Sequence, residues 1–165
     1  TTLEVEMRKI MRKGFDFLKK NMPSFENSFI LDSASQTGTR GSRRLIGEYT
    51  MTKKDMLSDT PPEDTIAIIP RFGRPGAAFT GSTVIYFPYR ALVPEKIEGL
   101  LVAGRSFSSD AETNNMINLI PHCIAMGQAA GTAAALALQS GVSVRKVDYK
   151  SLQQSLKKQG VPLPG

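Results

Sequence analysis

Two glycines in a run of small side chains are the residues of this 165-residue chain that most suggest a functional site. Gly127 and Gly131 lie in PHCIAMGQAAGTAAALALQSG, residues 121–141, a stretch otherwise typical of a helix. Inside a helix each glycine costs about 1 kcal/mol relative to alanine. Either another group comes very close to the helix backbone, or the small residues only allow tight packing on a sheet. The spacing leaves both interpretations open.

His122 and Cys123 fall in the first turn of this predicted helix, which Pro121 begins and Gly141 caps. The free N–H groups and the positive dipole end of a helix favour a nearby anion or polarised carbonyl by up to about 2 kcal/mol. His122 is therefore either a neutral proton donor or a histidine that is simply hydrogen-bonded at a helix end. Cys123 is either a buried small hydrophobe or a redox centre, although no second cysteine exists for a disulfide.

A strand, a loop and this helix are the elements that must position these residues. GLLVAGR, residues 99–105, is a short apolar run typical of a strand buried on both faces. In an α/β unit, the carboxyl end of such a strand meets the amino end of the next helix and forms a ligand crevice. Elsewhere we expect helices over 3–21 and 148–159, a helix start at Thr52, and strands over 28–35, 65–70 and 83–89. The loop RFGRPGAAFTGS, 71–82, has a length typical of functional loops, although Arg71 and Arg74 are expected to be solvent-exposed.

The composition is that of an ordinary globular domain, with 41% hydrophobic and 22% charged residues and a net charge of +6. The basic clusters do not interleave with aromatic residues, and no zinc or helix-turn-helix spacing occurs, so we expect no nucleic-acid partner. An anionic cofactor or substrate accounts equally well for the positive charge. No apolar stretch reaches the roughly 18 residues of a membrane span, and the single cysteine favours a cytoplasmic location.

Two long segments are similar to a known family. YFPYRALVPEKIEGLLVAGRSFSSDAETNNMINLIPHCIAMGQAAGTAAALALQSGVSVRKVD, residues 86–148, resembles the C-terminal part of the FAD-dependent oxidoreductases related to the fumarate reductase and succinate dehydrogenase flavoproteins. MPSFENSFILDSASQTGTRGSRRLIGEYTMTKKDM, residues 22–56, is similar to the family's preceding segment. Together the matching motifs extend over roughly residues 5–160, in unbroken order.

The resemblance implies a mixed α/β fold, the C-terminal part of a Rossmann-like FAD-binding fold plus part of an inserted substrate or cap region. Residues 1–98 would belong to the cap region, 99–141 would be the closing strand and helix of the FAD-binding domain, and 142–165 a C-terminal helix and tail. The family's G-x-G-x-x-G motif is absent from this sequence. The resemblance therefore implies that an N-terminal FAD-binding portion or another subunit holds the ADP half of FAD.

The implied activity is hydride transfer between flavin N5 and an unidentified small-molecule carbon substrate, with no metal. A non-catalytic binding or regulatory module derived from this fold is the alternative, and self-association into a homo-oligomer is left open. The resemblance places the cofactor contacts at Ala103, Gly104, Arg105, Asn118, Pro121, His122, Cys123, Gly127 and Gln128, and the catalytic candidates are Arg40, Arg90 and His122.

Two of these positions carry open alternatives. Arg90 is either a substrate clamp or the partner of a structural ion pair. Family members usually have an arginine where Asn118 stands, three residues before the proline of the helix. An asparagine can donate a hydrogen bond but carries no charge. Either another arginine substitutes for it, or the chemistry of this member is altered.

Overall fold

The computed structural model of the protein describes residues 2–41, 43–70 and 84–164. The chain divides into two units, residues 1–39 and 40–165, and each is described by itself below. The sequence-based division at 98/99 and 141/142 stays a prediction. The loop 71–82, with Arg71 and Arg74, lies outside the described residues.

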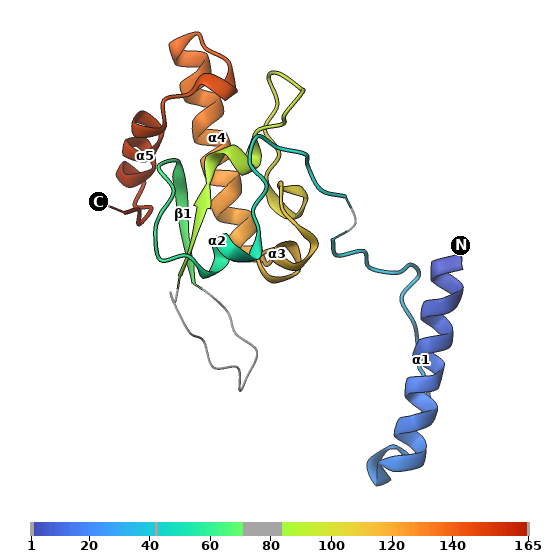
Figure 1. Ribbon diagram of the computed structural model, residues 1–165. Coiled ribbons are helices and arrows are strands. Elements are labelled where there is room, and N and C mark those ends of the chain that lie inside the picture. The colour runs from blue at the N-terminus through green and yellow to red at the C-terminus, as the bar shows by residue number, and fades with distance from the viewer. Residues whose placement is uncertain (1, 42, 71–83, 165) are drawn as a thin grey trace. The chain divides into compact units, whose positions relative to one another are not determined.

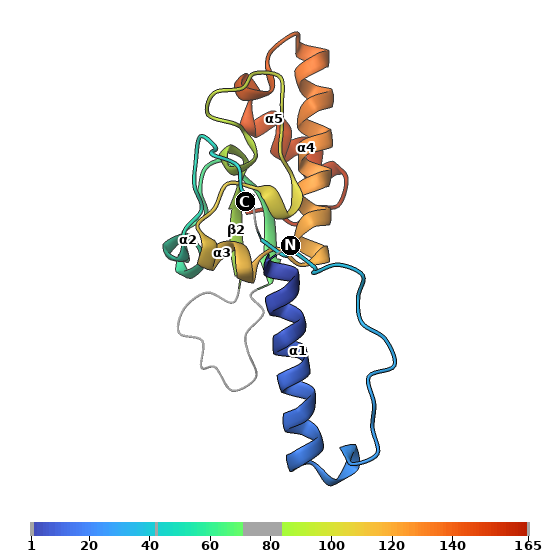
Figure 2. The ribbon, with the colours of Figure 1, turned by 90° about the vertical axis from the view of Figure 1, so that its right-hand side faces the viewer.

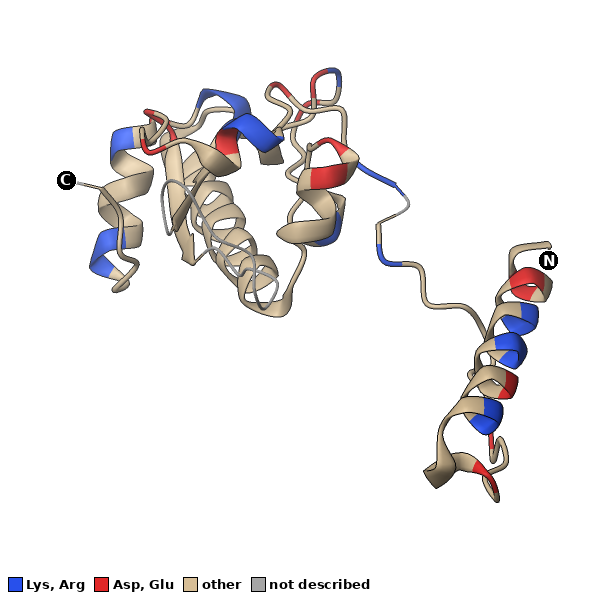
Figure 3. Cartoon of the chain, turned by 60° about the horizontal axis from the view of Figure 1, so that its bottom comes forward, with Lys and Arg blue, Asp and Glu red and all other residues tan. Residues whose placement is uncertain are grey.

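The first unit contains one long helix, α1 (Thr2–Asn21), which confirms the helix expected over 3–21. Charged residues of both signs follow one another along it (Figure 3), and none of its residues is buried. The strand expected over 28–35 is wrong, since this segment is not a strand. The segment contacts α1 instead of a second strand. Arg8 donates hydrogen bonds to the side chain of Ser33 at 2.9 Å and to the carbonyl of Ala34 at 3.1 Å.

The second unit contains an antiparallel hairpin of β1 (Thr65–Pro70) and β2 (Val84–Pro88), which confirms the strands expected there. Ile69 pairs with Ile85, and the register shifts between Thr65 and Ala67. These strands are rich in β-branched and aromatic residues, as the pleated surface of a sheet favours. The hairpin packs on a long helix, so the described part of this unit combines helices and strands and confirms the mixed α/β class.

Helix α4 (Ile120–Ser140) is the longest element of the second unit and runs along it in two views (Figure 1 and Figure 2). Its buried residues recur every three or four positions and are His122, Met126, Ala129, Ala133 and Ala137. This face packs against β1 and against α5 (Tyr149–Lys158), which buries Leu152 and Leu156. Phe87 of the hairpin meets Phe107 edge to face, with ring centroids 5.1 Å apart. The small alanines let the helix lie close to the hairpin, which is the tight-packing role considered from the sequence.

The helix ends follow the local signals in the sequence. Gly141 takes a positive φ of 64° at the end of α4, and Pro121 lies in its first turn. Asp148 accepts a hydrogen bond from the N–H of Ser151 at 2.8 Å and so caps α5. Thr52 precedes the short helix α2 (Lys53–Leu57), as expected. These boundaries confirm the predicted helix starts and stops.

The strand expected over 99–105 is wrong, because these residues form extended chain and then a 3-10 turn, Gly104–Ser106. A strand requires a neighbour that pairs along its length. Here the N–H of Val102 donates to the carbonyl of Leu92 at 2.8 Å, and no ladder follows within the described residues. None of residues 99–105 is buried, since Leu100 is 41% exposed and 101–104 are half-buried. The expectation of a strand buried on both faces is therefore wrong in burial as well as in pairing.

Candidate functional site

Gly104 and Cys123 bring the end of the 99–105 segment to the first turn of α4. Gly104 has a φ of 79°, a conformation that side-chain-bearing residues rarely adopt. A methyl group added there would lie 3.9 Å from Cys123 Sγ. Cys123 Sγ in turn lies 3.7 Å from the carbonyl oxygen of Asn118. Three residues predicted to contact one ligand therefore lie at one place, together with the extended Ala103 that precedes the turn.

Leu119, Ile120 and Pro121 at the amino end of α4 are exposed, and the histidine that follows them is buried. Leu119, the residue before the helix, offers no side-chain acceptor, and Ile120 is 77% exposed. His122 turns inward and is 1% exposed, and its Nδ1 accepts the N–H of Leu119 at 3.3 Å. Burial lowers the pKa of His122, and a hydrogen bond with the backbone of Ile117 opposes this in part. This geometry favours a neutral histidine that holds the helix end, and its catalytic role stays a prediction.

Arg40 reaches the α4 end from a segment that is remote in the sequence. Its Nε donates to Oδ1 of Asn118 at 2.9 Å, across 78 positions of the chain. Its Nη2 donates to the carbonyl of Asn115 at 3.4 Å. Position 118, where family members usually have an arginine, thus holds an asparagine, and this asparagine binds Arg40. Of the two alternatives left open by the sequence, this contact favours a substituting arginine.

A short helix that the sequence analysis missed, α3 (Ala111–Met116), lies just before Asn118 in the chain and contacts the turn at Arg105. Asp110 caps it by accepting the N–H of Thr113 at 2.7 Å. The side-chain amide of Asn114 donates to the carbonyl of Arg105 at 2.9 Å. Asn114 was not among the predicted site residues, although an aspartate before a polar run is a helix-start signal that could have revealed this element.

Arg90 and Gln128 make their contacts with other elements. Arg90 Nε lies 3.0 Å from Oδ2 of Asp64, whose carboxylate is fully buried, and the hydrogen bond to Asp64 raises the pKa of Arg90. The guanidinium also lies over the ring of Tyr49, 5.5 Å from its centroid. Gln128 Nε2 donates to Oε1 of Gln159 on α5 at 2.9 Å. These contacts favour structural roles for both side chains.

One face of α4 carries no cover from the described residues of the second unit. It consists of exposed residues spaced three or four positions apart, here called the α4 stripe: Ile120, Ile124, Gly127, Gly131, Ala135 and Leu138. Ile124 is 65% and Leu138 84% exposed. Among the described residues, no atom lies within 4 Å of a methyl group added at either glycine. No residue of α4 is charged (Figure 3). The stripe is therefore an uncharged surface opposite the packed face.

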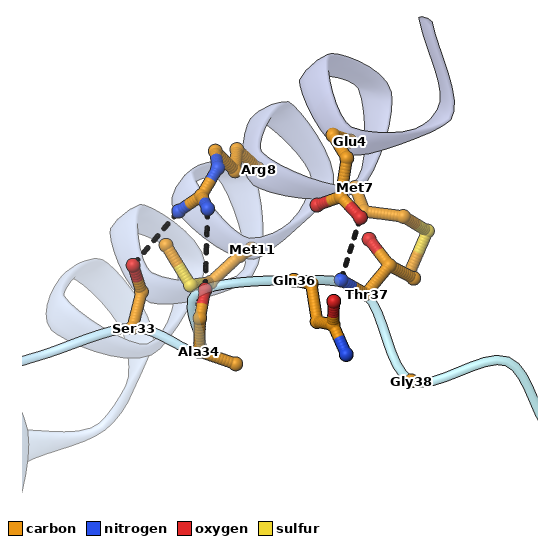
Figure 4. A pocket seen from close by; sticks show the side chains of 9 residues that line it. All are labelled: Glu4, Met7, Arg8, Met11, Ser33, Ala34, Gln36, Thr37 and Gly38. Carbon is orange, nitrogen blue, oxygen red and sulfur yellow. Dashed lines mark hydrogen bonds between the residues drawn. The ribbon is translucent and has the colours of Figure 1, made fainter. Parts of the chain in front are cut away.

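The first unit has a pocket of its own, with a volume of about 290 Å³ (Figure 4). It lies between α1 and residues 33–38, and none of the predicted site residues lines it. Its polar groups are engaged within the unit, since Glu4 accepts the N–H of Thr37 at 2.6 Å and Arg8 holds the 33–35 segment. The pocket is thus a gap in the contact between α1 and the following chain, and it contains none of the predicted site residues.

The described ranges contain neither a metal-binding cluster nor a membrane-spanning helix. No group of histidine, cysteine, aspartate and glutamate side chains there could hold a metal ion. No helix in the same ranges has both the length and the apolar character needed to cross a membrane.

Comparison with known proteins identifies one family. The family model described as FAD dependent oxidoreductase matches residues 1–156, which cover nearly the whole chain. Neither the curated proteins nor the solved structures contain a match.

Proposed function

This chain belongs to the FAD-dependent oxidoreductase family, and we propose that it forms the C-terminal part of a flavoenzyme in which the amino end of α4 faces the flavin. FAD, when bound, exchanges a hydride at N5 with a carbon of a small-molecule substrate. The ADP half of FAD would be held by a polypeptide outside these 165 residues, an N-terminal segment or another subunit, because the sequence contains no G-x-G-x-x-G motif. We also propose a relationship to the fumarate reductase and succinate dehydrogenase flavoproteins, on the motifs quoted above.

The groups at the amino end of α4 fit a flavin. The first-turn N–H groups of a helix have no carbonyl partner within it, and Leu119 supplies no cap. Ring carbonyls of a flavin are acceptors that such groups bind, and the positive helix end stabilises negative charge on the ring. Gly104 adds a close backbone approach beside Cys123. This chain would therefore hold and polarise the ring while the other part holds the nucleotide.

The observation that carries the proposal is the α4 stripe. A surface helix normally turns charged or polar residues to water, whereas the α4 stripe turns only apolar residues and glycines outward. The packed face of α4 already completes the core of the second unit, so the stripe is not needed for that core. We propose that the FAD-binding part docks on the stripe, with Gly127 and Gly131 at the closest approach. No self-association is needed for this arrangement.

Among the catalytic candidates, we propose Arg40 as the residue that meets substrate. Its side chain is exposed and lies at the α4 end, where Asn118 holds it. Arg90 is paired with a buried carboxylate, and His122 is enclosed. Both would then act by holding the structure rather than by touching the substrate.

The test combines this chain with the FAD-binding part and measures flavin retained by its visible absorbance after gel filtration. Ile124→Glu places a charge on the stripe and should abolish retention, while the chain alone stays folded because this side chain is exposed. Gln139→Glu, an exposed position of α4 outside the stripe, is the matched control and should retain flavin. Equal retention by both variants would refute docking on the stripe and favour a non-catalytic module.

A further inference from the structure

The amide of Asn118 has a fixed orientation because of its partner. A guanidinium carries only donors, so the atom that faces Arg40 Nε at 2.9 Å must be the amide oxygen. The amide nitrogen, Nδ2, then points away from that bond. Asn118 is 5% exposed, and Nδ2 has no hydrogen-bond partner within the described residues. A buried donor without an acceptor is rare in folded proteins and calls for a missing partner.

Positive charge lies beside this unpaired donor. Arg40 uses Nε and Nη2 to bind Asn118 and the carbonyl of Asn115. No carboxylate of the described ranges lies within ion-pair distance of it. The two acidic residues nearest to Asn118 along the chain are engaged elsewhere. Asp110 caps α3, and Glu112 pairs with Lys53 at 2.7 Å. The charge of Arg40 is therefore not cancelled by its surroundings.

The backbone keeps these groups in place. Asn118 lies between α3 and the amino end of α4, and its carbonyl contacts Cys123 Sγ in the first turn. The positive end of the α4 dipole adds a third source of positive potential. A cation, a buried amide donor and a helix amino end together form the donor set that binds an oxyanion, a carboxylate or phosphate group.

We infer that Arg40 and Asn118 form an oxyanion-binding site at the corner between α3 and α4, and that it takes a carboxylate or phosphate group of the substrate. The assignment of this group to the substrate rests on the proposed function. Asn118 Nδ2 donates to one oxygen of the anion, and the guanidinium neutralises its charge. Asn118 also positions Arg40, since the amide oxygen fixes Nε.

The experiment uses the 165-residue chain without flavin or a second polypeptide. The ¹⁵N-labelled chain is titrated with inorganic phosphate and, separately, with acetate, and the side-chain NH₂ signals of Asn118 are followed by NMR. Arg40→Gln should weaken binding of the preferred anion by about tenfold or more, since a charge-assisted hydrogen bond is lost. Arg43→Gln removes the same charge from the same exposed segment and is the matched control, with an expected change of less than about twofold.

The outcomes separate the two sources of the anion and the two proposals. Shifts with acetate support a carboxylate substrate, and shifts with phosphate alone support a phosphate-bearing one. An Asn118 signal that neither anion moves overturns the site, as does equal weakening by Arg40→Gln and Arg43→Gln. Arg40→Lys, which retains the charge but lacks Nε, should recover only part of the affinity. Because no flavin is present, these results do not depend on whether the FAD-binding part docks on α4.

Discussion

Replacing Gly127 and Gly131 by alanine should affect the chain alone and the assembled flavoenzyme in opposite directions. Both glycines lie inside α4 and are exposed, and no neighbouring atom lies within 4 Å of a methyl group added at either position. Within the described residues of the second unit the added methyl groups therefore meet nothing. In the assembly proposed above, they would stand between α4 and the part that docks on it.

The size of the first effect follows from helix propensity. Alanine is favoured over glycine inside a helix by about 1 kcal/mol, so the double variant should gain about 2 kcal/mol in the free energy of unfolding. At about 4 °C for each kcal/mol, the Tm should rise by about 8 °C. In the assembly, forcing a methyl group into a close contact costs about 1–3 kcal/mol at each site. Flavin retention should therefore fall by about tenfold or more, although the chain itself is more stable.

Thermal unfolding of the chain alone and flavin retention by the assembly measure the two effects separately. Gln139→Ala, exposed on the same helix outside the stripe, should change either quantity by less than about 0.5 kcal/mol. If the glycine variants are stabilised yet retain flavin like the wild type, close approach is not the reason for these glycines. If instead their Tm falls, the glycines are packed inside the chain itself and the stripe is not free.

Three further predictions concern the second unit. Gly47→Ala should destabilise it by about 1–3 kcal/mol in urea unfolding, because the new methyl would lie 2.8 Å from Ser108 Cβ and 3.0 Å from the carbonyl of Val93; an unchanged midpoint would contradict this packing. His122 is buried with a lowered pKa, so the unfolded chain binds its proton more readily and stability should fall as pH drops below about 6.5. Unfolding curves of the wild type and of His122→Gln at two pH values test this, because the variant should lose that part of the pH dependence. An equal loss of stability at the lower pH in wild type and variant would assign the pH dependence to another group. Asp148→Ala removes the cap of α5 and should lower stability by about 1 kcal/mol, with Asp148→Asn as a control that keeps an acceptor.

The elements that the sequence predicted correctly are those with local signals. Pro121 and Gly141 delimit α4, and Asp148 begins α5, because caps act through backbone groups only a few residues away. The segments 28–35 and 99–105 have apolar residues typical of strands, but a strand also needs a distant neighbour, and their composition cannot say whether one is present. One of them lies on α1 and the other connects to the carbonyl of Leu92.

The candidate site shows the same division between local and distant information. Motif resemblance named Gly104, Asn118 and Cys123 separately, and the fold brings them together. The contact between Arg40 and Asn118 spans 78 positions and depends on a turn of the chain that no local pattern encodes. Arg90 was left with two roles because the sequence could not reveal the buried Asp64 beside it.

The composition of α4 is best understood from its two faces together. Alanines at 129, 133 and 137 bring the helix close to the hairpin, and this requirement explains small residues on the packed face alone. It does not explain Gly127 and Gly131, which contribute nothing to that packing and lower the helix propensity. Nor does it explain why a helix of 21 residues carries no charge where it is exposed. Both features are accounted for if a second surface covers the stripe, so that one helix serves two interfaces and its amino end lies where they meet.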